Sequence, residues 1–111
     1  MKLLNAFSLA MLPQLSGVSV SVTEITLAQA QNQAKQGLQS FVGHAAACSL
    51  FTALLGVPVA ENRVSSKLAC GEVALVGQYT GPRLPEGATT LPEGAAIAWC
   101  LIRVSCCTLV G

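Results

Sequence analysis

The chain has 111 residues, of which 52% are hydrophobic and 10% are charged, and its formal net charge is +1 with histidine neutral. This composition is typical of a globular protein and argues against a disordered chain, while the small net charge argues against broad electrostatic binding to long nucleic acid. We expect a single domain over residues 1–111. Because a chain this short and apolar has surface to bury, we also expect a homodimer.

Strand and helix signals alternate along the chain, which predicts an α/β or α+β domain with a small mixed β-sheet flanked by helices. A first strand is expected at residues 2–6, before a short helical turn that Ser8 is placed to cap and Pro13 stops. Alternating valine and serine predict a half-buried strand at residues 18–22. Residues 27–38 are rich in alanine and glutamine, which predicts a helix ended by a glycine.

The second half of the chain predicts one more helix and three strands. The helix is expected to begin around His44 and to end at Gly56, a residue type that commonly caps helix C-termini. Trp99 and Leu101 lie in an apolar run and are expected in the core. The three strands are expected at residues 58–68, 72–79 and 96–105, the first two joined by a tight turn at residues 69–71.

The N-terminus and the cysteines bear on location. Asn5 and Ser8 interrupt the apolar start that would otherwise resemble a signal peptide, and no apolar segment reaches the roughly 20 residues that a membrane helix needs. We therefore expect no membrane association and a cytoplasmic protein, in the host cytoplasm if it is viral. The cysteines form no CxxC pair, and their odd number leaves one unpaired in a monomer. They are Cys48, Cys70, Cys100, Cys106 and Cys107.

The residue inventory excludes several kinds of site. The chain has no aspartate, so it can assemble neither a Ser-His-Asp triad nor an aspartate-based metal cluster. With one histidine and scattered cysteines, the ligand spacing of a zinc site is absent. His44 is placed near a helix N-terminus, where backbone N–H groups and the helix dipole attract anions such as phosphate. The expectation is acid-base chemistry supported by arginine, without metal or cofactor.

A short repeat separates the last two expected strands. Leu84-Pro85-Glu86-Gly87 recurs seven residues later as Leu91-Pro92-Glu93-Gly94. Each Pro-Glu-Gly is suited to a turn, so both copies have a plain interpretation as loop residues. The first copy differs because Arg83 directly precedes it, which makes Glu86 a candidate site residue.

Five short groups of residues occur in order along the chain. They are Asn5-Ala6-Phe7-Ser8-x-x-Met11-Leu12, Gly43-His44, Asn62-Arg63-Val64, Gln78, and Arg83-Leu84-x-Glu86-Gly87. In this order and spacing they resemble the viral type III anti-CRISPR ring nucleases and their cellular relatives, over nearly the whole chain. The resemblance implies a homodimeric enzyme, with its ligand site at the dimer interface, that binds cyclic tetra-adenylate and cleaves it without metal to linear di-adenylate ending in a 2′,3′-cyclic phosphate.

The resemblance also implies roles for single residues. His44 matches the general acid, and Glu86 matches the glutamate that assists it, since a carboxylate beside an imidazole favours the protonated form. Guanidinium groups suit phosphate oxygens, and side-chain amides can read an adenine edge. The substrate-binding candidates are Asn5, Ser8, Arg63, Gln78 and Arg83. Each also has a structural interpretation, as a capping, strand-edge or exposed loop residue.

Two other functions stay open on the sequence. One is a binding module that sequesters the cyclic nucleotide without cutting it. The other is a small secreted or structural protein with disulfides, which oxidised Cys100 and Cys106 would favour. Ala10 and Ala46 stand where some viral members carry polar side chains, so any contacts of those side chains with the ligand are absent from this chain.

Overall fold

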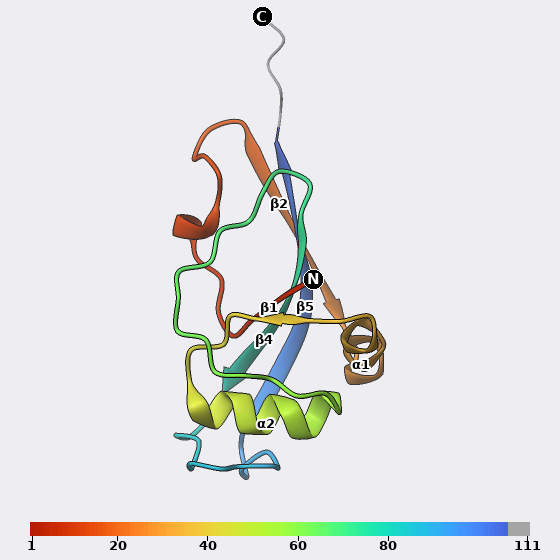
Figure 1. Ribbon diagram of the computed structural model, residues 1–111, viewed down its shortest axis with the longest axis vertical. Helices are drawn as coiled ribbons and strands as arrows, with labels where there is room; N and C mark the ends of the chain where they lie inside the picture. The colour runs from red at the N-terminus through yellow and green to blue at the C-terminus, as the bar shows by residue number, and fades with distance from the viewer. Residues whose placement is uncertain (107–111) are drawn as a thin grey trace, which may run out of the picture.

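The computed structural model describes residues 1–106, which form a mixed five-stranded sheet with two α-helices (Figure 1). The strand order is β2-β5-β4-β1-β3, with β1 parallel to both β3 and β4 and with β5 antiparallel to β2 and β4. The predicted α+β class and mixed sheet are confirmed. The elements are β1 (Lys2–Leu4), η1 (Leu9–Met11), β2 (Val18–Ile25), α1 (Leu27–Lys35), β3 (Gln39–Ser40), α2 (Ala45–Leu55), β4 (Val73–Thr80) and β5 (Ala96–Cys106).

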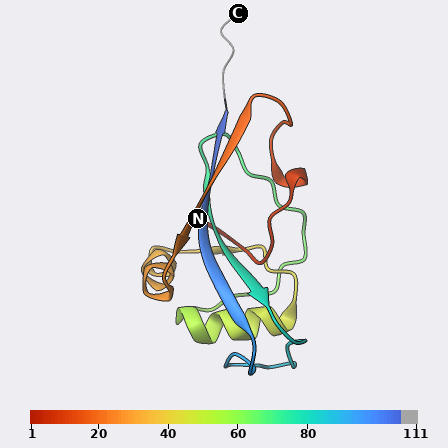
Figure 2. The same cartoon turned by 180° about the vertical axis from the view of Figure 1, so that it is seen from behind.

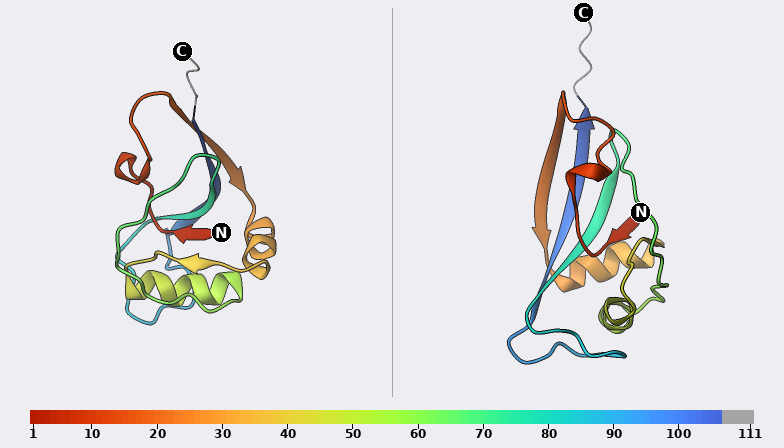
Figure 3. Two further views of the ribbon diagram at one scale, coloured as in Figure 1. Left: turned by 45° about the horizontal axis from the view of Figure 1, so that its top comes forward. Right: turned by 90° about the vertical axis from the view of Figure 1, so that its left-hand side faces the viewer.

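The sheet separates two apolar clusters because neighbouring strand residues point to opposite faces. Leu3 and Leu75 pack against the helices, whereas their neighbours Leu4 and Val76 pack on the other face against Leu68 and the N-terminal segment. The right-hand view of Figure 3 shows both helices on one side of the long strands. The expectation of helices flanking the sheet is therefore met on one face, while irregular chain covers the other.

The helix boundaries follow from local chemistry. Thr26 caps α1 through a capping box, in which its hydroxyl accepts from the Gln29 N–H and the Gln29 side chain accepts from the Thr26 N–H. Helix α2 ends at Gly56, whose φ of 76° is left-handed and whose N–H donates to the Thr52 carbonyl at 3.0 Å. Both helices occur where the sequence predicted them, with α1 ending at Lys35, three residues early.

Gly77 sets how closely α2 approaches the sheet. A Cβ at this position of β4 would lie 2.7 Å from Phe51 Cζ and 2.7 Å from Trp99 Cζ3, so the two rings occupy the space that a side chain would fill. The ring centroids of Phe51 and Trp99 are 5.0 Å apart. Trp99 is buried as predicted, and Leu101 packs at the edge of the same cluster.

The predicted strand at residues 58–68 is wrong. That segment has an irregular backbone, and its one ladder contact is a single parallel bridge between Glu61 and Val42. Its backbone donors are satisfied by scattered acceptors instead: the Val59 N–H donates to Thr52 Oγ1, and the Leu68 N–H donates to the Met11 carbonyl. The tight turn at residues 69–71 therefore joins an irregular segment to β4, and the two-residue β3 was not predicted.

Cys70 and Cys106 form a disulfide with their Cα atoms 5.4 Å apart, a pairing that the sequence did not predict. Of the two cysteines whose oxidation would favour the secreted or structural alternative, Cys106 is oxidised and Cys100 is a free thiol. Cys48 is free and buried. Cys107 lies outside the described residues. Within residues 1–106, no helix is long and apolar enough to cross a membrane, and no three side chains of the metal-ligating types gather into a group.

Candidate functional site

His44 occupies the N-cap of α2, with an extended backbone (φ −131°, ψ 118°). Its carbonyl accepts the first helical hydrogen bond, from the Cys48 N–H at 3.0 Å, while its side chain makes no capping bond. The imidazole is exposed, and the first turn of α2 contains no acidic residue. An anion beside His44 would therefore meet free helix N–H groups whose partial positive charge nothing on the helix offsets.

A cavity of about 440 Å³ lies at this end of α2. One wall is the start of the helix, from His44 to Ala46, and the other is the loop that follows β4, including Arg83 and Glu86. Figures 1 and 2 show this loop running beneath α2, at the end of the molecule opposite the C-terminal end of β5. Three residues predicted to share a site, His44, Arg83 and Glu86, therefore line one cavity.

A second cavity of about 310 Å³ adjoins the first and shares His44, Arg83 and Leu84 with it. Asn5 lines this second cavity, at the bend that follows β1. Its other walls are largely apolar: Ala47, Phe51, Tyr79, Gly81 and Pro82. The site thus has a polar compartment beside the helix N-terminus and a more apolar compartment that carries one side-chain amide.

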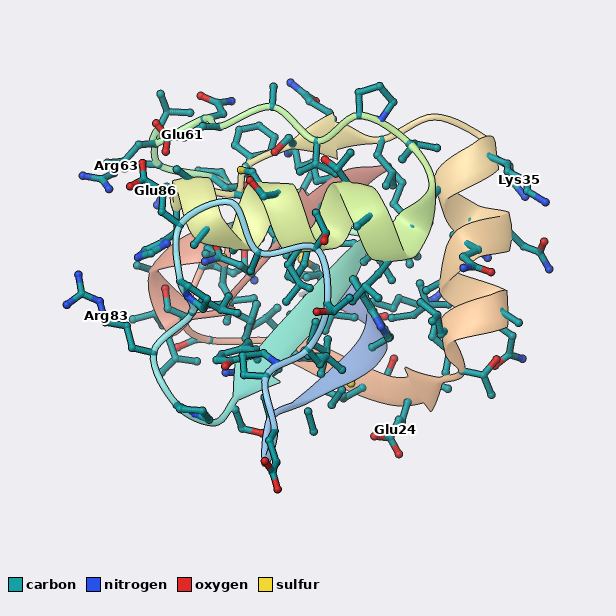
Figure 4. All side chains as sticks on the ribbon, turned by 90° about the horizontal axis from the view of Figure 1, so that it is seen from below. Glu24, Lys35, Glu61, Arg63, Arg83 and Glu86 are labelled. Atoms are coloured by element: carbon teal, nitrogen blue, oxygen red, sulfur yellow. A yellow bond between two sulfur atoms is a disulfide. The ribbon has the colours of Figure 1, made fainter. Side chains whose placement is uncertain are left out.

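Arg63 contacts the backbone next to His44. Its Nε donates to the Gly43 carbonyl at 2.9 Å, and a Cβ on Gly43 would lie 3.3 Å from Arg63 Cα, so the two segments pack closely. Figure 4 shows Arg63, Arg83 and Glu86 at the same end of α2, with Lys35 at the far side of the molecule. Arg83 extends outward from its loop in this view. Arg63 therefore lies beside the residue that precedes His44, but it lines neither cavity.

Both copies of the repeat are turns, as predicted. The Ala88 N–H donates to the Pro85 carbonyl at 3.2 Å, and the Ala95 N–H donates to the Pro92 carbonyl at 3.0 Å. The copies differ in their surroundings, because Glu86 lines the cavity with His44 and Glu93 lines neither cavity of the site. The turn interpretation and the site interpretation of Glu86 are therefore compatible.

The structure does not bring Ser8 and Gln78 to these cavities. Gly77 and Tyr79 face α2, so Gln78, between them on β4, points to the opposite face, where its Nε2 lies 3.4 Å from the Tyr79 carbonyl. Ser8 stands at the N-cap of η1 without a side-chain capping bond and lines a separate hollow with Ser66 and Lys67. Strand alternation explains the first outcome, and the position of η1 on the other face of the sheet explains the second.

Comparisons with known proteins identify the family. A family model described as STIV B116-like matches residues 1–96. This chain belongs to the STIV B116-like family. The assignment made above from the ordered motifs, to the viral type III anti-CRISPR ring nucleases, is corrected by this match. No curated protein matches the chain.

The fold of this STIV B116-like protein is also that of a solved structure. B116 of Sulfolobus turreted icosahedral virus superposes with a TM-score of 0.72 at 22% sequence identity, and the match covers 94% of this chain and 97% of that one. At this identity the likeness concerns the fold alone.

Sequence reasoning missed the residues that build the apolar compartment of this STIV B116-like chain. Tyr79, Phe51 and Ala47 were not candidates, because apolar and aromatic residues at strand or helix spacing indicate core packing. One signal was available: Tyr79 is the single tyrosine of the chain and precedes Gly81 and Pro82 at a strand end, where binding residues concentrate.

Proposed function

We propose that this protein is a metal-independent ring nuclease that binds cyclic tetra-adenylate, cleaves it to linear di-adenylate with a 2′,3′-cyclic phosphate, and so switches off type III CRISPR second-messenger signalling. The observation that carries the proposal is the single cavity lined by His44, Arg83 and Glu86 at the N-terminus of α2. It combines the titratable imidazole of His44, the permanently charged guanidinium of Arg83 and free backbone N–H donors, which are the groups that phosphodiester cleavage uses.

The two adjoining cavities suit one nucleotide unit of such a ring. The compartment at the helix N-terminus offers Arg83 and backbone N–H groups to a phosphate. The neighbouring compartment offers apolar walls, including Phe51 and Tyr79, to a base, and the Asn5 amide supplies the paired donor and acceptor that an adenine edge requires. Because both compartments share His44, the imidazole would stand between the base and the phosphate.

The chemistry needs few groups. The ribose 2′-oxygen attacks the adjacent phosphorus and forms the cyclic phosphate, while the bond from phosphorus to the 5′-oxygen breaks. In our scheme water takes the proton of the 2′-hydroxyl, and His44 gives a proton to the leaving 5′-oxygen. Arg83 offsets the growing charge on the phosphate oxygens, and Glu86 assists His44 from the opposite wall of the cavity. Arg63 holds the backbone at Gly43 and completes the positive surroundings.

The proposed enzyme is a homodimer that works in the cytoplasm. Two-fold symmetry would place one His44 at each of two opposite linkages of the ring, which accounts for two cuts by a chain with one histidine. Light scattering of the purified protein should give twice the mass of the 11.4 kDa chain.

The test is to incubate the purified protein with cyclic tetra-adenylate in excess chelator and to resolve the products by chromatography and mass. Replacing His44 with Ala should lower turnover by about 10²- to 10⁴-fold and leave binding largely intact, because a general acid acts in the transition state. The repeat offers a matched pair: Glu86→Gln should lower turnover, while Glu93→Gln should not. Unchanged turnover in His44→Ala would remove the acid from the mechanism.

A sequestering module is the second candidate, and one observation favours it. In the described part of the chain the only ion pair joins Lys2 and Glu72, so Glu86 reaches the cavity without an ion pair to His44 or to either arginine. A site that binds without reacting needs no such pair. Tight binding of cyclic tetra-adenylate by the wild type, with no product after long incubation, would establish this function instead of the nuclease.

A further inference from the structure

We propose that Tyr79 is a positioning residue, whose hydroxyl fixes the loop of residues 81–95 and so sets where Arg83 and Glu86 stand against α2. Its kinetic consequence rests on the proposed function, whereas its structural consequence can be measured without any substrate. Tyr79 lies near the end of β4, half-buried, with its ring in the wall of the apolar compartment.

The hydroxyl of Tyr79 bonds to the loop itself. It donates to the Pro82 carbonyl at 2.5 Å, and that carbonyl belongs to the peptide bond that joins Pro82 to Arg83. The bond therefore orients the peptide unit directly before the candidate phosphate ligand. Because Pro82 also has a fixed φ, little backbone freedom remains between the strand end and Arg83.

The two ends of the loop touch at a narrow neck. Gly81 has a φ of 139°, and a Cβ on it would lie 2.7 Å from Ala95 Cα and 2.8 Å from Ala95 Cβ. The Thr80 hydroxyl adds a long contact of 3.5 Å to the Ala96 carbonyl. The absence of a side chain at Gly81 thus lets the first residue of the loop pack against Ala95, its last residue, and Tyr79 lies two residues before this contact.

Beyond the neck, the loop is held only by itself. Among the hydrogen bonds of residues 1–106, those within positions 83–95 are the two local turns, Ala88 to Pro85 and Ala95 to Pro92, and none joins these positions to another element. The Tyr79 bond is consequently the nearest fixed point to Arg83. Its removal would free Arg83 and Glu86 together, while His44 stays in place on α2.

The substrate-free test is limited trypsin digestion of Tyr79→Phe, which keeps the ring and removes the hydroxyl. Cleavage after Arg83 should become about fivefold faster, as expected when loss of one hydrogen bond raises the population of the open loop. Cleavage after Arg63 should stay unchanged, and Tm should fall by no more than about 5 °C. Thr23→Val is the matched control, since it removes an exposed hydroxyl from the distant edge strand β2. An unchanged rate of cleavage after Arg83 would overturn the proposal.

The kinetic test uses the same variant with cyclic tetra-adenylate. KM should rise about three- to tenfold and kcat should fall by a similar factor, because Arg83 and Glu86 lose their fixed positions together while His44 keeps its place on α2. Faster cleavage after Arg83 together with an unchanged KM would overturn the role in substrate binding. If the wild-type protein cleaves no cyclic tetra-adenylate, the nuclease proposal fails, and the digestion still decides whether Tyr79 positions the loop.

Discussion

Two long irregular segments carry the candidate arginines, and they are held in opposite ways. Residues 56–72 carry Arg63 and are fixed along their whole length, whereas residues 81–95 carry Arg83 and Glu86 and are fixed at the neck. The first segment is held by one disulfide, Cys70–Cys106, and by hydrogen bonds to other parts of the chain. The hydrogen-bonded pairs are Ala60 with Ser40, Asn62 with Ser40, Arg63 with Gly43, Lys67 with Ala10, Leu68 with Met11, and Gly71 with Val104.

The difference separates residues 56–72, a supporting segment that contributes to stability, from residues 81–95, a segment that is free to respond to a ligand. Each bond of residues 56–72 costs stability when it is lost, and Arg63 is part of that set through its bond to the Gly43 carbonyl. Arg83 makes no side-chain hydrogen bond in the described residues, so it contributes little to folding and is free to bind a ligand. Variants of the two segments should therefore move different observables.

The largest effect on stability should come from the disulfide. Replacing Cys70 and Cys106 together with Ser should cost roughly 3 kcal/mol, because the crosslink closes a loop with a sequence separation of 36. For a domain of this size that corresponds to a Tm lower by about 15 °C, measured by calorimetry. Cys100→Ser is the control for losing a thiol that forms no disulfide. Equal Tm values for the double variant and the wild type would show that the other bonds alone hold residues 56–72.

The two arginines should give the sharpest contrast. Arg83→Ala should lower kcat/KM for cyclic tetra-adenylate by about 10- to 100-fold at unchanged Tm, since a charge-assisted phosphate contact is lost. Arg63→Ala should lower kcat/KM and also Tm, by about 5 °C, because the Gly43 carbonyl loses its donor. The measurement pairs steady-state kinetics with thermal unfolding. A fall in Tm for Arg83→Ala, or none for Arg63→Ala, would contradict the division into two kinds of segment.

The smallest effect should appear at Glu72, at the C-terminal end of the supporting segment. Burial raises the pKa of its carboxyl, but the Ala69 N–H at 2.9 Å and the Lys2 ammonium at 3.2 Å outweigh burial, so the pKa lies below its ordinary value. The carboxylate therefore stabilises the fold above its unfolded pKa of about 4.3, and this stabilisation is lost as pH falls through the folded pKa.

Glu72→Gln tests that pH dependence. At neutral pH the variant should unfold about 2–4 °C below the wild type, for a loss of about 0.5 kcal/mol in this solvent-screened pair, and the gap should close in acid as the wild-type carboxylate is protonated. Thermal unfolding as a function of pH measures it. A gap of constant size at every pH would show that the charge of Glu72 contributes nothing.

The sequence predicted the parts of the fold in which local signals and burial agree. Residues 18–22, 72–79 and 96–105 alternate or run apolar, and all three are strands. The segment at 58–68 has the composition of a strand, yet its backbone groups bond to neighbouring loops and side chains, which no local pattern reveals. Strand β3 has two residues and is too short for any periodicity.

The candidate site was predictable where chemistry and position coincide. His44 is the one imidazole of the chain, and Arg83 and Glu86 are charged residues of a turn, so residue type singled them out. Gln78 carries suitable chemistry on the wrong face of β4, and a shift of one residue along a strand reverses the face. The Cys70–Cys106 pairing depends on which strand ends meet, and the sequence does not show that.

Gly77 couples the sheet to the site in one further way. Every replacement at this position adds at least one carbon between the Phe51 and Trp99 rings, so even alanine, the smallest side chain, would force these rings to move. A glycine within a strand weakens that strand, but here the missing side chain lets α2, the helix that carries His44 at its N-cap, pack closer to the sheet. Because Phe51 also lines the apolar compartment, any side chain at Gly77 would change the shape of the site as well as the packing of the core.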